Sequence, residues 1–305
     1  MPANLTPQYK EAEERFRKAT TREEKLVALR EMLALLPKHK GTSARFDPGH
    51  VRREGAGQWV LLGAANAGKS ALLRALTSAH PEVAPYPFTT RMPQPGMMPF
   101  EDIQVQIVDT PAITPAHSEV YMPNLARNAD GLAIVLDVTD DDLEENHRIC
   151  RAVLERARVW PAATALPADA SPVLVVRPVF VLANKCDLDP DGTFVALARE
   201  TVGSSDPFFA VSAEHGLGLE ELRPRLFREL GRIRIYTKEP GKKPDFERPF
   251  VLAHGATVGQ LALAVHKEVA QRLKFARIWG AARFDGQQVD RDHVLSDRDV
   301  VELHA

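Results

Sequence analysis

The sequence predicts an α/β fold with a mainly parallel sheet, preceded by a helical hairpin and followed by a small α+β domain. Short apolar runs at 103–109, 131–137 and 179–183 alternate with segments whose apolar positions have helical spacing. Apolar strands that alternate with helices are typical of parallel sheets covered on both faces. The alternation stops near residue 232, which indicates that a second domain follows.

The beginning of the chain is predicted to be helical. Residues 7–36 carry apolar positions at helical spacing, interrupted near Thr21, which together with Glu24 resembles a capping box. We therefore expect a helical hairpin over 1–42. Residues 43–57 mix glycine, proline and charge and are predicted to be a linker, so the main α/β domain is expected over 58–236.

The end of the chain has a different pattern. Residues 237–248 are rich in proline, glycine and lysine, which predicts a linker. Residues 249–305 combine strand-like runs with one helical segment that starts near Thr257, which is typical of a small mixed sheet crossed by a helix.

Composition excludes several classes of protein. The 39 Lys and Arg residues nearly balance the 41 Asp and Glu residues, so net charge indicates neither a nucleic-acid partner nor its absence. Two cysteines, Cys150 and Cys186, are too few for a disulfide framework. No apolar run approaches the roughly 20 residues that span a bilayer, which argues against membrane insertion. The first residues lack the apolar core of a signal peptide, so we expect a cytoplasmic location.

The main chemical motif is a phosphate-binding loop at 63–70, which follows an apolar strand-like run and precedes a helical one. A glycine-rich turn that opens a helix directs backbone N–H groups and the positive end of the helix dipole at one point, which suits a polyphosphate. Lys69 is expected to reach the β and γ phosphates, and the Ser70 hydroxyl to ligate Mg²⁺. The nucleotide-contacting residues of this stretch are predicted to be Gly63, Asn66, Ala67, Gly68, Lys69, Ser70 and Ala71.

A second motif predicts that the base is guanine. Asp187 lies just after the apolar run 179–183, where its carboxylate can accept hydrogen bonds from the N1 and N2 hydrogens of guanine. Asn184 and Lys185 are expected to brace this loop. Farther along, the pair Ser212 and Ala213 is expected to present a backbone N–H to guanine O6. A P-loop kinase of small molecules is disfavoured, because such kinases seldom carry this base-binding motif.

Two further residues are predicted to complete a Mg²⁺ site with Ser70. Asp109 ends a strand-like run and is expected to hold the ion through water. Thr90, in the proline-rich stretch, is the candidate for the second hydroxyl ligand, ordered only while the γ-phosphate is bound, and the neighbouring Thr89 is its rival.

With these motifs in order, the sequence resembles a translation-factor-class GTPase of the Obg superfamily. The stretch 86–90 is similar to that superfamily's first switch, and 235–302 contains segments that look like the TGS domain of the developmentally regulated GTP-binding protein (DRG) family. The resemblance implies a P-loop GTPase domain, a β-grasp-like TGS domain and a ribosome or RNA partner. Ala112 stands where the family usually has glycine, and 109–184 is short for the helical insert of DRG proteins.

The resemblance also bears on catalysis. Ile113 occupies the place of the water-orienting glutamine of Ras-like enzymes, so hydrolysis is expected to be slow without a partner. Asn66 has two interpretations: its amide stabilises the loop, or its oxygen holds K⁺ beside the phosphates. The candidate catalytic residues are Lys69, Thr90 and Asn66, with Mg²⁺ as the cofactor and K⁺ as a second candidate.

Basic residues gather between the two domains, and they too have two interpretations, a solvated linker or a patch that binds RNA phosphates. They are Arg223, Arg225, Arg228, Arg232, Arg234, Lys238, Lys242 and Lys243. The function predicted from the whole sequence is a GTP-hydrolysing switch that acts with the ribosome or RNA through its TGS domain. The alternative is a nucleotide-sensing scaffold with little hydrolysis and a protein partner. The sequence leaves the oligomeric state open.

Overall fold

The computed structural model describes residues 51–77, 92–114, 119–280 and 284–305, together with Arg15, Lys18 and Glu24. The chain divides into two units, Met1–Phe46 and Asp47–Ala305. Apart from Arg15, Lys18 and Glu24, which are helical, the hairpin expected over 1–42 lies outside the described residues, as does most of the linker expected over 43–57. The fold below is therefore that of the second unit.

The first sheet confirms the predicted α/β class. Its strand order is β2-β3-β1-β4-β7-β8, and all neighbouring pairs are parallel except β2 with β3. The strands are β1 (Gln58–Leu62), β2 (Gln94–Phe100), β3 (Ile103–Asp109), β4 (Gly131–Asp137), β7 (Val179–Asn184) and β8 (Phe208–Ala210). Two prolines fall in β2, which tolerates them because it is an edge strand.

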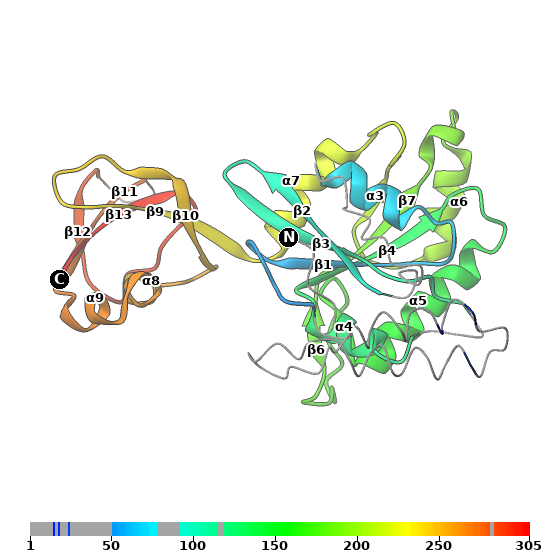
Figure 1. Ribbon diagram of the computed structural model, residues 1–305, viewed down its shortest axis with the longest axis horizontal. Helices are drawn as coiled ribbons and strands as arrows, with labels where there is room; N and C mark the ends of the chain where they lie inside the picture. The colour runs from blue at the N-terminus through cyan, green and yellow to red at the C-terminus, as the bar shows by residue number, and fades with distance from the viewer. Residues whose placement is uncertain are drawn as a thin grey trace. The chain divides into compact units, whose positions relative to one another are not determined.

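Helices cover both faces of this sheet (Figure 1). They are α3 (Lys69–Leu76), α4 (Met122–Asn128), α5 (Leu143–Ala157), α6 (Thr193–Val202) and α7 (Leu219–Glu229). Side chains of β1 alternate between the two faces: Val60 packs in the core that contains α4 and α5, whereas Trp59 packs in the core that contains α3 and α7. The continuous apolar runs in the sequence thus belong to strands that are buried on both sides.

Glycine 131 shows how tightly the two layers fit. A β-carbon at this position would lie 2.7 Å from the indole of Trp59. The same indole donates a hydrogen bond of 2.9 Å to the carbonyl of Leu226 in α7. The large aromatic ring therefore fills the space between β4 and α7 and leaves no room for a side chain on β4.

A short parallel pair, β5 (Val159–Pro161) with β6 (Val175–Arg177), extends the segment after α5. The two strands lie at either end of the proline- and alanine-rich stretch 160–172. Within the described ranges, every helix is too short or too polar to span a lipid bilayer.

The second sheet has the order β10-β9-β13-β11-β12 and carries α8 (Val258–Val265) and α9 (Lys267–Arg272). Its strands are β9 (Arg232–Lys238), β10 (Asp245–Ala253), β11 (Phe275–Trp279), β12 (Gln287–Val289) and β13 (Asp299–His304). As predicted, the sheet is mixed: β9 is parallel to β13 and antiparallel to β10.

The second sheet begins earlier than the boundary expected at residue 237. β9 pairs with β10 and β13, so residues from Arg232 onward belong to the C-terminal domain. The stretch expected to be a linker, 237–248, contains the end of β9 and the start of β10. Charged and proline residues conceal this hairpin in the sequence, because the first half of β10 is exposed and its register shifts between Asp245 and Phe250.

Candidate nucleotide site

The phosphate loop lies between β1 and α3, as expected from its sequence. Gly68 precedes the helix with φ of 93°, a conformation that favours glycine. A β-carbon on Gly68 would lie 2.1 Å from the side-chain nitrogen of Asn184. Glycine is therefore required here both by the backbone angle and by the close approach of another loop.

Asn184 joins three loops of the site. Its Nδ2 donates to the carbonyl of Ala67 at 2.8 Å, and its Oδ1 accepts from the backbone N–H of Ala213 at 3.1 Å. The side chain is almost fully buried, and both ends of its amide are satisfied. The expected bracing role of Asn184 thus takes the form of a link between the phosphate loop and the segment that follows β8.

Lys69 begins α3 and is buried at the centre of the loop. Its Nζ donates to the carbonyls of Gly63 at 2.9 Å and Ala64 at 2.8 Å. Burial lowers the pKa of this ammonium group, and the charge of Asp109 partly opposes that effect. The ammonium is held inside the loop by neutral carbonyls, so its charge remains available for an anion.

Ser70 and Asp109 meet where α3 faces the end of β3. The Ser70 hydroxyl donates to Oδ2 of Asp109, whereas Oδ1 is buried and makes no hydrogen bond. Burial raises the pKa of Asp109, although the Ser70 hydrogen bond and the Lys69 charge act in the opposite direction. A hydroxyl beside a carboxylate with an unpartnered buried oxygen is a donor set that fits a hard cation such as Mg²⁺.

Two neighbouring cavities lie along this edge of the sheet. The larger, of about 670 Å³, is lined by residues of the phosphate loop, by Asp109 and by Pro111 and Ala112. The smaller, of about 270 Å³, is lined by Asn184, Asp187 and Ala213 among others. Gly68, Ala71 and Lys185 line both cavities. The phosphate loop and the base motif therefore border adjacent compartments, which suits the two parts of a nucleotide.

Lys185 and Asp187 both line the smaller cavity. The Asp187 carboxylate is 3.7 Å from Nε2 of His215. Lys185 has a left-handed backbone and forms an ion pair with Asp137 at the end of β4. This ion pair fixes the base loop to the neighbouring strand and keeps Asp187 at the cavity.

Most of the predicted site residues come together at these cavities. The larger cavity is lined by Asn66, Gly68, Lys69, Ser70, Ala71 and Asp109, and the smaller by Asn184, Lys185, Asp187 and Ala213. Gly63, Ala67 and Ser212 do not line either cavity. Their oxygens instead accept hydrogen bonds from Lys69, Asn184 and the backbone N–H of His215, respectively. Thr90 and its rival Thr89 lie outside the described residues.

The segment after Asp109 is anchored to the phosphate loop. Ile113 is 1 % exposed, and its backbone N–H donates to the carbonyl of Gly63 at 3.1 Å. The side chain packs in the core beside α4 and offers no polar group to the cavity. Whatever orients a water molecule here must therefore come from another residue.

Sequence reasoning missed three residues of the site. Asp137 pairs with Lys185, and Arg74 and Gln94 line the larger cavity. Asp137 could have been predicted from the sequence, because it is the last residue of a buried parallel strand and ligands bind at the carboxyl ends of such strands. Arg74 lies one helical turn after Ser70, which places both on the same face of α3.

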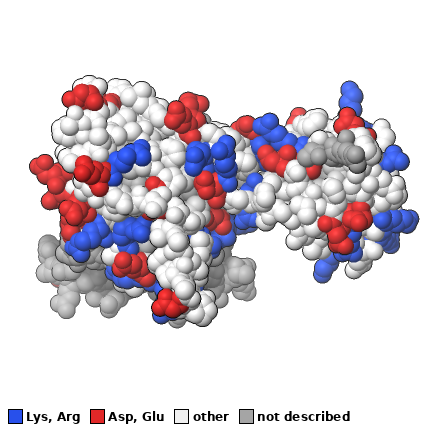
Figure 2. Space-filling view, turned by 180° about the vertical axis from the view of Figure 1, so that it is seen from behind, with Lys and Arg blue, Asp and Glu red and all other residues white. Residues whose placement is uncertain are grey.

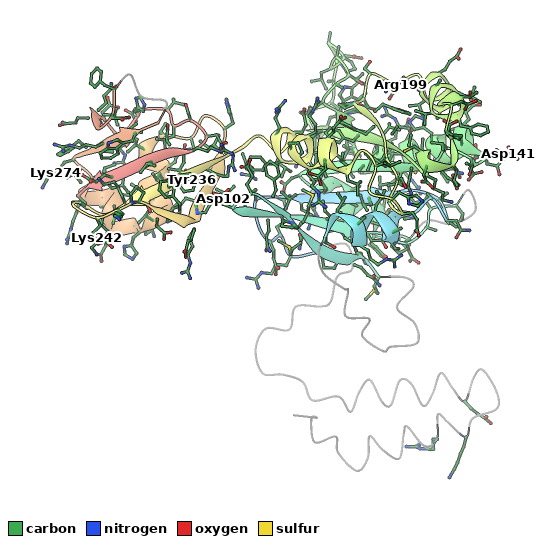
Figure 3. All side chains as sticks on the ribbon, turned by 90° about the horizontal axis from the view of Figure 1, so that it is seen from above. Asp102, Asp141, Arg199, Tyr236, Lys242 and Lys274 are labelled. Atoms are coloured by element: carbon green, nitrogen blue, oxygen red, sulfur yellow. The ribbon has the colours of Figure 1, made fainter. Side chains whose placement is uncertain are left out.

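The basic residues between the domains are largely engaged in internal contacts. Arg223 donates to the carbonyls of Leu76 and Ala75 that end α3, Lys238 pairs with Glu302, and Lys242 pairs with Glu239. Lys242 lies on the outside of the C-terminal domain (Figure 3), and on the face drawn in Figure 2 basic and acidic side chains are interspersed. This pairing favours the structural interpretation of most of the cluster, with Arg228 and Lys243 left exposed.

Comparison with known proteins agrees with this geometry. Residues 58–165 match the family described as 50S ribosome-binding GTPase, and residues 233–305 match the TGS domain. The chain is 29 % identical to an uncharacterized GTP-binding protein of Halobacterium salinarum, over 84 % of this chain and 85 % of the relative. It is 28 % identical to developmentally-regulated G-protein 2 of Arabidopsis thaliana, over 92 % and 83 %. The solved YchF GTPase of Schizosaccharomyces pombe shares the fold at 14 % identity, with a TM-score of 0.54 over 83 % of this chain and 99 % of that one.

Replacing Asp187 by asparagine tests the base motif. An amide presents a donor where the carboxylate accepts, so Asp187→Asn should lower affinity for GDP by a factor of about 10² or more and raise affinity for xanthosine diphosphate. Competition against a fluorescent nucleotide measures both. If ATP displaces GDP from the unaltered protein as well as GTP does, the role of Asp187 is refuted.

Replacing Asp109 by asparagine should separate stability from function. Because burial raises its pKa, ionised Asp109 opposes folding at neutral pH, so Asp109→Asn should raise the free energy of unfolding of the nucleotide-free protein by about 1 kcal/mol. The same change should weaken Mg²⁺-dependent GTP binding. Urea unfolding without Mg²⁺ provides the measurement, with Asp141→Asn at an exposed position as the matched control. Lower stability of Asp109→Asn would show that the carboxylate is satisfied without a cation.

Proposed function

We propose that this chain is a cytoplasmic GTPase switch whose TGS domain binds the ribosome or other RNA according to the nucleotide bound. It joins a P-loop GTPase domain to a C-terminal TGS domain and is similar over most of its length to developmentally regulated GTP-binding proteins. The predicted site residues act in this proposal as the parts of a Mg·GTP site.

The observation that carries the proposal is the single amide of Asn184. It fixes the phosphate loop through Ala67 and the base loop through Ala213. Binding of phosphates alone, as in a P-loop kinase of small molecules, does not require a hydrogen-bonded link between the phosphate loop and a second loop that carries Asp187. The arrangement supports simultaneous recognition of the phosphates and of guanine.

Ser70 and Asp109 are the residues of the described chain that would hold Mg²⁺, and Thr90 is proposed as the third. The unpartnered Oδ1 of Asp109 is the feature that fits the ion. When bound, Mg²⁺ offsets the negative charge of the β and γ phosphates. The contribution of Lys69 is a buried ammonium already directed into the loop, so little reorganisation is needed when the phosphates arrive.

Asn66 is proposed to hold K⁺. It lies in the larger cavity with a φ of 61°, and within the described part of the chain its exposed amide makes no hydrogen bond that would stabilise the loop. That observation supports the cation role over the structural one. Because the apolar Ile113 cannot orient water, an additional cation beside the phosphates is the contribution this loop could make to hydrolysis.

The K⁺ proposal predicts an ion-specific rate. At equal ionic strength, single-turnover GTP hydrolysis should be faster in KCl than in NaCl by a factor of about 10². Asn66→Ala should remove the difference while leaving GDP affinity nearly unchanged, because within the described residues the amide makes no hydrogen bond to the loop. Equal rates in the two salts would refute the cation role. Rates near zero in both would favour the scaffold with little hydrolysis.

The proposed RNA partner rests on the TGS domain rather than on the basic residues near the junction. Those residues are mostly neutralised by acids or helix carbonyls, so they offer few free charges to a phosphate backbone. Recognition through the TGS domain would therefore depend on its shape and on cations that are exposed elsewhere on it. These include Arg248, Lys267, Arg272, Lys274, Arg277 and Arg291.

Co-sedimentation with purified ribosomal subunits tests the partner. The full chain should sediment with subunits in a non-hydrolysable GTP analogue more than in GDP, because only the triphosphate is expected to order the loops near Asp109. A chain that ends at Gly231 should keep GDP binding and lose sedimentation. We place the end at Gly231 because it removes β9 together with its partners β10 and β13. A chain that ended after Tyr236 would keep most of β9 but lose both strands with which it pairs. Absence of sedimentation for the full chain in both nucleotides would refute the ribosome as partner.

A further inference from the structure

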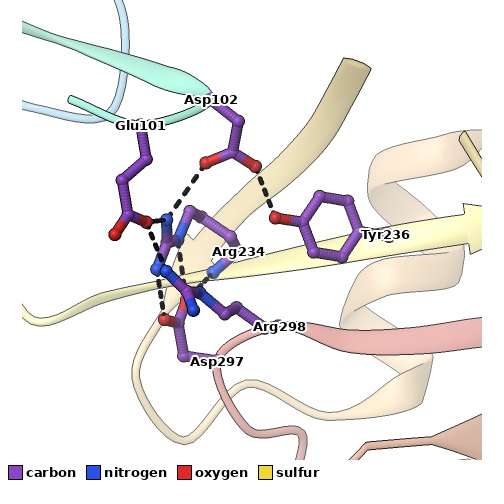
Figure 4. A network of polar contacts seen from close by, with 6 residues as sticks. All are labelled: Glu101, Asp102, Arg234, Tyr236, Asp297 and Arg298. Carbon is purple, nitrogen blue, oxygen red and sulfur yellow. Dashed lines mark hydrogen bonds and ion pairs between the residues drawn. The ribbon is translucent and has the colours of Figure 1, made fainter. Parts of the chain in front are cut away.

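The Arg234 side chain of β9 is 4 % exposed and lies among three carboxylates (Figure 4). Two of them, Glu101 and Asp102, form the turn between β2 and β3 of the GTPase domain. The third, Asp297, precedes β13 in the TGS domain. A buried guanidinium thus joins the far end of the β2–β3 hairpin to the TGS sheet.

The contacts differ on the two sides of Arg234. Toward the TGS domain, Nη2 and Nε donate to the two carboxylate oxygens of Asp297 at 2.6 and 3.1 Å, and the backbone N–H of Arg234 donates to the same residue at 2.7 Å. Toward the GTPase domain, Nη1 pairs with Glu101 and with Oδ1 of Asp102 at 3.0 Å. The pair with Asp297 is complete by itself, so the contacts to the hairpin can be weakened separately.

Aromatic groups complete the junction. The hydroxyl of Tyr236 donates to Oδ2 of Asp102 at 2.5 Å, and Figure 3 shows the two residues side by side. The guanidinium of Arg234 also lies 5.1 Å from the ring centroid of Phe227 in α7. Each oxygen of Asp102 therefore has a partner on β9.

The charges at this junction reinforce one another. Hydrogen bonds from Arg234 and Arg298 lower the pKa of Glu101. Burial alone would lower the pKa of Arg234, but its hydrogen bonds to the three carboxylates raise it. For Tyr236, burial and the hydrogen bond to Asp102 raise the pKa to about 12. All members keep their charge state through the physiological range, so the junction is stable to changes of pH near neutrality.

The other end of the same hairpin borders the nucleotide cavity. Gln94, the first residue of β2, pairs with Asp109, the last residue of β3, and both line the larger cavity. Each strand has seven residues, so the hairpin spans about 20 Å between the cavity and the turn. Its register is continuous over this length, from Gln94 with Asp109 to Phe100 with Ile103.

The hairpin is also in contact with the helix that opens at the phosphate loop. A β-carbon on Gly96 would lie 2.9 Å from side-chain atoms of Leu73 in α3 and of Thr77, the residue that caps the end of α3. β2 therefore lies directly on α3, and a shift of the strand end at the cavity cannot be absorbed by loose packing in between.

We propose that the β2–β3 hairpin couples the nucleotide site to the TGS domain, with Arg234 as the residue through which the TGS sheet responds to the position of the turn. A change of nucleotide that displaces the strand ends at Asp109 displaces Glu101 and Asp102 at the turn. Arg234 follows those carboxylates and carries β9 and the loop at Asp297 with it. The coupling operates whatever macromolecule the TGS domain binds.

The alternative is a static clamp, in which the same contacts hold the two domains together whichever nucleotide is bound. Coupling and a static clamp predict different results when the contact at the turn is weakened. Coupling between two sites is reciprocal, so weakening the contact at the turn must also change the preference of the distant site for one nucleotide over the other. A static clamp contributes stability equally in both nucleotide states.

The test weakens only the GTPase side of the junction. The double variant Glu101→Gln, Asp102→Asn leaves Arg234 paired with Asp297, and hydrogen exchange of β9 and β13 amides is followed in the full chain with GDP and with a non-hydrolysable GTP analogue. In the unaltered protein, the exchange rates of these amides should differ between the two nucleotides. In the double variant, the rates should be the same with both nucleotides. Glu239→Gln, which disrupts the exposed pair with Lys242, is the control and should retain the difference.

Nucleotide affinity provides the second readout. The ratio of affinities for the GTP analogue and for GDP should change by a factor of about 5 or more in the double variant, the lower end of usual allosteric coupling. Tyr236→Phe removes only the hydrogen bond to Asp102 and should reduce the exchange difference in a chain that folds normally. The proposal is overturned if the unaltered protein shows the same exchange with both nucleotides, or if the difference and the ratio persist in both variants.

Discussion

The absence of a β-carbon at residue 68 is the constraint on which both compartments of the nucleotide site depend. The side-chain nitrogen of Asn184 occupies the space that a β-carbon would need, and from there it reaches the carbonyl of Ala67. Its oxygen then fixes Ala213 in the base loop. Any larger residue at position 68 would separate the two loops, and the phosphates and the base could no longer be held by one rigid frame.

The parallel sheet makes that frame possible. β1, β3, β4 and β7 run in the same direction, so the residues that follow them meet at one edge. Lys69, Asp109, Asp137 and Asn184 are brought together in this way from positions spread over more than one hundred residues of the chain. At this edge, the buried Oδ1 of Asp109 has no hydrogen-bond partner among the described residues.

The junction around Arg234 shows a different use of charge. Replacing a buried ion pair by apolar residues is often neutral or stabilising, so a cluster of one arginine and three carboxylates is weak evidence for stability. Its directional contacts instead define how the β2–β3 turn meets β9. An apolar junction could slide, whereas one guanidinium shared between Asp102 and Asp297 fixes a single arrangement.

The sequence by itself determined the class of the fold and predicted the motifs of the site. Buried strands are short apolar runs, and the phosphate and base motifs are local, because each needs fixed residue types at fixed spacing within one loop. For that reason the sequence alone predicts Lys69, Ser70 and Asp187 as site residues, and in the structure all three line the cavities.

The tertiary structure alone decided the partners of these local features. It assigned β9 to the TGS sheet, since a strand's sheet depends on distant β10 and β13 and not on its own pattern. It paired Lys185 with Asp137 and buried Arg234 among acids that lie 132 or more residues before it or 63 after it. Charged residues carry no periodic signal for a distant partner, so the sequence could not show that Arg234 and Lys238 pair with acids far along the chain.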